Sequence, residues 1–156
     1  MRLHRTVLCQ LALLSALLLL LVGCGSLIAD YSLDAYKNAT TLKAETAALI
    51  DKSNEPYDNH ANAVDDLTTK INAAYEFAAG LPSNQISAAQ WQILRDPNGK
   101  LYGGFLRRWR TGPLSTAYRA DKKRQINRAY DYIICLEANK KEPTVCPVAA
   151  TTQSGT

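Results

Sequence analysis

The feature that most constrains the fold is a regular spacing of apolar positions between residues 57 and 78. The positions that share it follow one another at intervals of three or four: Tyr57, His60, Val64, Leu67, Ile71, Ala74 and Ala78. This alternation places all of these side chains on one face of an α-helix. Such a helix depends on covering that face, so we expect the chain to build a core from several helices.

Two further stretches carry the same spacing and predict long helices. Residues 30–52 present one face made of Ala35, Ala39, Leu42, Thr46 and Leu49. Residues 113–140 present another, made of Ile126, Ala129, Ile133 and Leu136. Both segments are bounded by turn residues, which supports their assignment as helices.

The middle of the chain predicts shorter elements. Trp91 and Leu94 indicate a short helix, for which Ser87 and Gln90 form a candidate capping box. After an Asp-Pro-Asn-Gly turn at residues 96–99, the apolar residues 101–106 are interrupted by two glycines, which favours a loop leading into a short helix. Short connections between amphipathic helices predict an all-α fold, an antiparallel bundle of three to four helices.

The N-terminus reads as an export signal. Arg2 and Arg5 precede an apolar run of about 17 residues, the lower limit for a membrane span. The run ends in Leu-Val-Gly-Cys at residues 21–24, which resembles the bacterial lipobox. The resemblance implies cleavage before Cys24, acylation of Cys24 and attachment to the membrane. The alternative is an ordinary signal anchor that is not cleaved.

This interpretation divides the chain into four parts. Residues 1–23 are the signal peptide, 24–29 the lipidated anchor and tether, 30–146 the helical domain, and 147–156 a tail that we expect to be disordered. Gly25 and Ser26, rather than an aspartate, follow the cysteine. That favours the bacterial outer membrane, facing the periplasm, if the cell is Gram-negative.

The cysteines that remain after cleavage predict a disulfide. Cys9 leaves with the signal and Cys24 is acylated, so Cys135 and Cys146 remain. In an oxidising compartment two remaining cysteines commonly pair. The loop between them is short, so its closure contributes about 3 kcal/mol. Cys-x-x-Cys spacing, which favours redox catalysis, is not found in this pair.

Charge is distributed unevenly along the mature chain. Residues 24–91 carry four Lys and nine acidic residues, a net charge of −5, whereas residues 92–156 carry twelve basic and five acidic residues, a net charge of +7. The two halves could complement each other in the fold or leave a basic face. The candidate residues for binding an anionic ligand are Arg107, Arg108, Trp109, Arg110, Arg124 and Arg128. Trp109 is alternatively a core residue.

No catalytic constellation is evident, so we expect no enzyme, cofactor or metal. His60 is the one histidine left after cleavage, and Asp58, Asp65 and Asp66 lie near it in the sequence. A zinc site needs several nitrogen or sulfur ligands. Because His60 lies on the apolar face of its helix, an interior structural histidine is the favoured interpretation.

The final helix is similar to that of small bacterial lipoproteins in uncharacterised families. The residues that carry the resemblance are Ile126, Asn127, Ala129, Tyr130, Leu136, Glu137, Lys140 and Lys141. It implies an exported helical bundle and supplies no activity.

Two functions follow as hypotheses. The first is a structural or adaptor protein for a protein partner in the envelope. The alternative is a binder of phospholipid, lipopolysaccharide or wall polymer. Nucleic acid is excluded by the export signal.

Overall fold

The computed structural model describes residues 29–140 and 142–146. Five α-helices and two short 3₁₀ helices are found in this part of the chain. In chain order they are α2 (Leu33–Lys52), η1 (Tyr57–His60), α3 (Ala61–Gly80), α4 (Gln85–Arg95), α5 (Tyr102–Trp109), α6 (Thr116–Ala138) and η2 (Pro143–Val145). The signal peptide, Cys24 and the tail after residue 146 lie outside the described residues and stay predictions.

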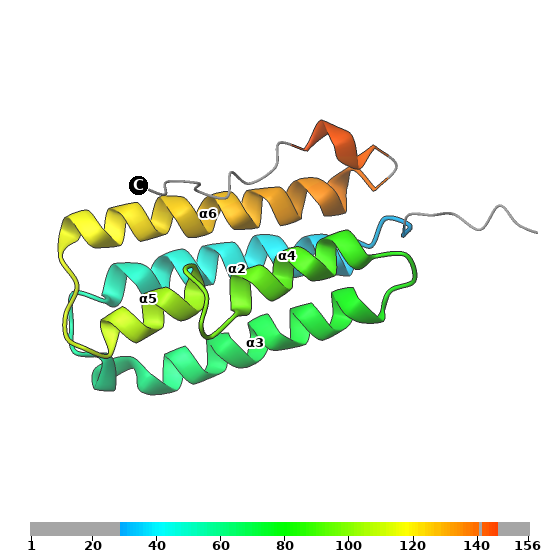
Figure 1. Ribbon diagram of the computed structural model, residues 1–156. Helices are drawn as coiled ribbons and strands as arrows, with labels where there is room; N and C mark the ends of the chain where they lie inside the picture. Colours follow the sequence, from blue (N-terminus) through cyan, green and yellow to red (C-terminus); the bar gives the residue numbers. More distant parts are fainter. Residues whose placement is uncertain (1–28, 141, 147–156) are drawn as a thin grey trace, which may run out of the picture.

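The helices form an antiparallel bundle of four rods (Figure 1). α2 runs in one direction, α3 returns, α4 and α5 follow end to end as a broken third rod, and α6 returns again. Each rod packs beside its neighbours in the ring α2, α3, α4, α6. The predicted all-α bundle is confirmed, with the two short helices counting as one rod. Among the described residues, no helix is both long and apolar enough to cross a bilayer.

The helix starts are set by capping residues. The Ser32 hydroxyl accepts a hydrogen bond from the Ala35 amide at 3.2 Å, so α2 begins at Leu33 rather than near residue 30. Ser115 accepts in the same way from the Tyr118 amide at 3.3 Å and starts α6. The capping box predicted at Ser87 is wrong, because α4 begins two residues earlier and buries Ser87 inside the bundle.

The core is aromatic as well as aliphatic. Trp91 packs edge-on against Tyr130, with ring centroids 5.8 Å apart. The Tyr130 hydroxyl is hydrogen-bonded to the buried Thr46 hydroxyl at 2.9 Å. Phe105 and Trp109 continue the core along α5, with centroids 5.5 Å apart. Each buried aromatic ring thus contacts another, and the polar atom of Tyr130 has a partner.

The two ends of the bundle are built differently. At the N-terminal end, where the described chain begins at Ala29, α2 and α4 start and α3 and α6 finish (Figure 1). Cys135 and Cys146 form a disulfide here, as predicted. The distal end is formed by residues 53–60 and 109–115, and there Trp109 donates from its indole N–H to the Glu55 carbonyl at 2.8 Å.

Candidate ligand-binding cleft

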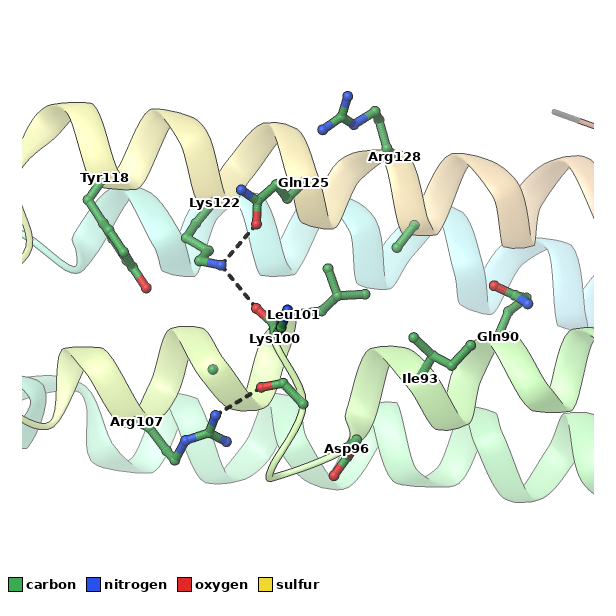
Figure 2. Close-up of a pocket in the computed structure, with 13 residues that line it drawn as sticks. Gln90, Ile93, Asp96, Lys100, Leu101, Arg107, Tyr118, Lys122, Gln125 and Arg128 are labelled. Carbon is green, nitrogen blue, oxygen red and sulfur yellow. Dashed lines mark hydrogen bonds between the residues drawn. The ribbon is translucent and has the colours of Figure 1, made fainter. Parts of the chain in front are cut away.

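A cleft of about 720 Å³ opens where the third rod is broken, between α4 and α5 on one side and α6 on the other (Figure 2). Its lining comes from both helical layers and from the intervening turn. The lining residues are Gln90, Ile93, Asp96, Gly99, Lys100, Leu101, Gly104, Arg107, Tyr118, Lys122, Gln125, Arg128 and Ala129. The cleft therefore brings together residues up to 39 positions apart in the sequence.

The turn between α4 and α5 is imposed by Pro97. A residue before proline avoids helical backbone angles, and Asp96 has φ −50° and ψ 116°. The Asp96 carboxylate accepts from the Asn98 amide at 2.9 Å, and its carbonyl accepts from the Gly99 amide at 3.0 Å. These bonds replace the helical ones that the proline removes, so α4 ends and the chain reverses into a tight turn.

Arg107 holds this turn from α5. Its guanidinium donates to the carbonyl of Pro97, to that of Asn98 at 3.2 Å and to that of Gly99 at 3.0 Å. The planar fork of arginine suits several carbonyls at once. Arg107 thus contributes positive charge to the cleft edge while already serving a structural purpose.

The two glycines in α5 allow its close approach to the turn. A Cβ added at Gly103 would lie 2.1 Å from the Asp96 carbonyl oxygen, and one at Gly104 would lie 2.8 Å from that of Gly99. The predicted short helix is found, but it begins at Tyr102, so both glycines belong to the first turn of α5 rather than to the predicted loop. They are required for close packing rather than for flexibility.

Lys122 is the most enclosed cation of the cleft. Its Nζ donates to the Lys100 carbonyl at 3.0 Å and to the Gln125 side-chain oxygen at 2.9 Å, as Figure 2 shows. Burial lowers the pKa of Lys122, an effect that Asp121 opposes and Lys100 reinforces. A negatively charged group bound in the cleft would therefore stabilise the charged form of Lys122.

The remaining lining combines positive charge with apolar surface. The side chains of Lys100 and Arg128 form no hydrogen bond or ion pair with other described residues, and the Arg128 guanidinium extends outward at the rim (Figure 2). Ile93, which is 49% exposed, and Leu101 supply apolar contact area. The lining holds four cationic side chains and one carboxylate, that of Asp96. The arrangement suits an anionic group joined to an apolar one.

The structure separates the residues that the sequence proposed for anion binding. Trp109 is fully buried and its indole N–H is bonded, so it is a core residue and not a binding platform. This corrects the prediction, and the reason is that Trp109 lies on the apolar side of α5 with Phe105. Arg107 and Arg128 line the cleft, as stated above.

Three other predicted arginines do not line the cleft. Arg108 bonds to Thr111, and Arg110 lies over the Tyr57 ring, 5.0 Å from its centroid. Arg124 pairs with Asp121 at 2.9 Å, one turn along its own helix. Adjacent residues on a helix point in different directions, so a run of arginines does not form one binding face.

Charge complementation between the two halves is partial. Lys123 of α6 pairs with Asp51 of α2 at 2.5 Å. This pair joins a basic residue of the second half to an acidic residue of the first half, as the uneven charge predicts. Lys43 and Asp131 form the opposite pairing, with the basic residue in the first half. Exposed pairs of this kind contribute at most about 1 kcal/mol each. The basic residues at the cleft are not part of this pairing.

His60 lies at the distal end, half-buried against the Trp109 ring, with centroids 5.7 Å apart, and its Nε2 is 2.8 Å from a Glu55 carboxylate oxygen. Within residues 29–140 and 142–146, no three histidine, cysteine or acidic side chains gather as metal ligands would. His60 thus has a structural environment made of one carboxylate and one indole.

Sequence reasoning missed Lys100 and did not connect Lys122 with the cleft. Lys100 follows the turn directly and is next to apolar Leu101, and this proximity to a helix break is the one available signal.

Comparison with protein-family models, with curated proteins and with solved structures finds no match for this chain. The resemblance of its last helix to small bacterial lipoproteins therefore stays a prediction.

Proposed function

We propose that the protein is a lipid-anchored protein of the bacterial envelope, without catalytic activity, that binds an anionic ligand with an apolar part in the cleft. The observation that carries this proposal is the excess of cations in the lining, where Lys100, Lys122 and Arg128 accompany Arg107 and only one carboxylate, that of Asp96, is present. Phospholipid and lipopolysaccharide have both parts, whereas an acidic wall polymer supplies the negative charge alone.

The anchor is proposed from the lipobox-like residues 21–24, which place acyl chains on Cys24. Several chains give stable attachment, because one buried chain alone binds a membrane only marginally. The outer membrane, facing the periplasm, is the proposed location in a Gram-negative cell. Its external position brings the cleft to envelope ligands and keeps it from nucleic acid.

Titration calorimetry of the acylated protein, anchored in phosphatidylcholine vesicles, tests the cleft. Hexyl phosphate serves as the lipid-like probe and a glycerol phosphate oligomer as the polymer-like probe, with hexanol and inorganic phosphate as partial ligands. We expect hexyl phosphate to bind more tightly than the oligomer or either partial ligand, since the cleft offers both charge and apolar area. Protein-free vesicles give the blank.

The variant Lys100→Ala/Arg128→Ala should weaken that binding about tenfold or more, the effect of losing about 1.4 kcal/mol. Neither side chain bonds to other described residues, so the bundle should stay folded. Arg124→Ala is the matched control, one helical turn from Arg128 and paired with Asp121 outside the cleft. Equal binding by the double variant and the protein itself would contradict the proposal.

The adaptor function is the second proposal. An exposed apolar surface at the N-terminal end, described below, would suit a protein partner as well as a membrane. Its test is a pull-down from envelope extract with the full chain at about 0.5 M salt, where charge is screened within about 4 Å. A single protein that is retained there and lost on mutation of Phe77 and Ile86 to Ser would favour the adaptor over the cleft.

A further inference from the structure

Large apolar side chains are exposed at one end of the bundle. Six are prominently exposed in the described residues, and Ile93, one of them, lines the cleft. The other five belong to segments that meet at the N-terminal end (Figure 1): Tyr31, Leu33, Phe77, Ile86 and Val145. Their exposed fractions run from 37% for Phe77 to 56% for Val145. A cluster of such residues marks an interaction surface more often than scattered ones do.

The segments that carry these side chains are fixed to one another. The Ala29 amide donates to the Ser83 carbonyl at 3.1 Å, which joins the start of the chain to the α3–α4 connection. Asn84 donates from its side chain to the Ala78 carbonyl at 2.9 Å. Lys140 of the α6 end donates to Asn84 and, at 2.9 Å, to Ser87. The surface is therefore preformed by buried polar contacts.

The position of this surface relative to the proposed anchor is limited by chain length. Five peptide units join Cys24 to Ala29, and a fully extended chain of that length spans at most about 18 Å. An acylated Cys24 would hold Ala29, and with it the N-terminal end, within that distance of the bilayer. No other face of the bundle is under this restriction.

We propose that the N-terminal end rests on the membrane surface, with Tyr31, Leu33, Phe77 and Ile86 inserted at the lipid headgroup boundary. This rests on the proposed acylation of Cys24. Aromatic and branched apolar side chains favour this boundary, where one side of a residue is apolar and the other is wet. The tether raises the local concentration of the bilayer at this surface, so a small apolar area is sufficient.

The charges around the surface are mainly acidic, which opposes electrostatic adsorption to anionic lipid. The exposed charged residues nearby include the acidic Asp30, Asp34, Glu76 and Glu142 and the basic Lys37, one turn of α2 after Leu33. Docking should therefore occur on zwitterionic lipid and resist salt.

Docking at the N-terminal end also fixes the orientation of the cleft, because Ile93 lies two helical turns, about 10 Å, farther along α4 than Ile86. The cleft then opens above the headgroups.

Tryptophan quenching by lipids with brominated acyl chains tests the docking. Ile86→Trp is placed in the full, acylated protein and reconstituted into phosphatidylcholine vesicles. We expect the added indole to lose most of its emission and to shift to shorter wavelength, at low and at high salt. The native Trp91 and Trp109 are buried inside the bundle and supply a constant background.

Ala120→Trp is the matched control, an exposed position in the second turn of α6, near the distal end, where no quenching is expected. Vesicle flotation is measured on the same samples. Flotation without quenching of Ile86→Trp would overturn the docking and leave the anchor intact. Loss of flotation would overturn the anchor, and the docking with it. Equal quenching at both positions would show adsorption without the proposed orientation.

Discussion

The N-terminal and distal ends of the bundle distribute polar and apolar groups in opposite ways. The distal end buries the Trp109 ring against Tyr57 and Phe105 and exposes polar side chains such as Asp58 and Arg110. The N-terminal end buries Asn84, Ser87, Glu137 and Lys140 and exposes Tyr31, Leu33 and Ile86. The distal arrangement is the usual one in water. The apolar side chains exposed at the N-terminal end suit the membrane contact proposed above, and the difference between the ends can be tested by perturbing each end separately.

The largest effect is expected from Trp109→Ala at the distal end. The change removes a fully buried indole and its hydrogen bond to the Glu55 carbonyl. We expect a loss of about 4 kcal/mol in the free energy of unfolding, measured by urea titration followed by circular dichroism. Tyr31→Ala, which removes an aromatic ring that is 55% exposed, should change it by less than about 0.5 kcal/mol. A loss below about 1 kcal/mol for Trp109→Ala would contradict the assignment of this residue to the core.

The next effect concerns the buried ion pair at the N-terminal end. Lys140 Nζ lies 2.9 Å from a Glu137 carboxylate oxygen, and the Glu137 side chain is fully buried. Lys140→Met leaves that carboxylate without its partner and should cost about 3 kcal/mol in the same urea titration. The exposed Lys37→Met serves as the control.

A double variant separates the two explanations of such a loss. If the cost of Lys140→Met arises from an uncompensated charge, adding Glu137→Leu should restore more than half of the lost stability. If the double variant is as unstable as the single one, the hydrogen bonds from Lys140 to Asn84 and Ser87 hold this end together, and the ion pair is secondary.

These two ends also show what the sequence could and could not predict. The spacing of apolar residues was sufficient for α2, α6 and most of α3, because a three-four interval has one helical interpretation. Tyr57 and His60, the first two positions of the predicted face, instead form the 3₁₀ helix η1, and α3 begins at Ala61. Cysteine counting was sufficient for the Cys135–Cys146 disulfide, which the structure confirms. The interior position of Trp109 was open, since an aromatic residue among arginines suits a core or a surface equally well until its helix is oriented.

The cleft and the buried polar cluster depend on contacts across the bundle. Lys100 and Lys122 meet because the turn packs against α6, and local sequence carries no signal for that. Ser87 has the composition of a helix cap, but Asn84 and Lys140 bind it from other segments, and this tertiary interaction decides its position. The sequence around Gly103 and Gly104 does not indicate that backbone carbonyls of the preceding turn pack closely against these two glycines.

A separate effect is expected only at alkaline pH. Burial raises the pKa of Tyr102 to about 12, against an ordinary value of 10.0, and burial likewise raises the pKa of Tyr130. Below pH 10 these tyrosines are protonated in both states and have no effect. Above it the unfolded chain ionises first, so each tyrosine should lower stability by about 1.4 kcal/mol per pH unit as pH rises toward the folded pKa.

Urea titrations between pH 9 and 12 would measure this slope. Tyr102→Phe should reduce it, because phenylalanine does not ionise in either state, whereas Tyr31→Phe at an exposed position should leave it unchanged. Tyr102→Phe also loses the hydrogen bonds of the Tyr102 hydroxyl to the Thr68 hydroxyl at 3.0 Å and to the Val64 carbonyl at 3.4 Å. This loss lowers the stability of the variant at neutral pH but does not affect the slope. An unchanged slope in Tyr102→Phe would contradict the burial argument.

We propose that this protein is held to a membrane by Cys24, close to the end of the bundle that exposes apolar side chains. Mass spectrometry of the mature protein, extracted from membranes of cells that express the full chain, tests it most directly. We predict an N-terminal peptide that begins at Cys24 and carries the mass of its acyl chains. A mature chain that retains residues 1–23, or that begins after a different residue without lipid, would contradict the account.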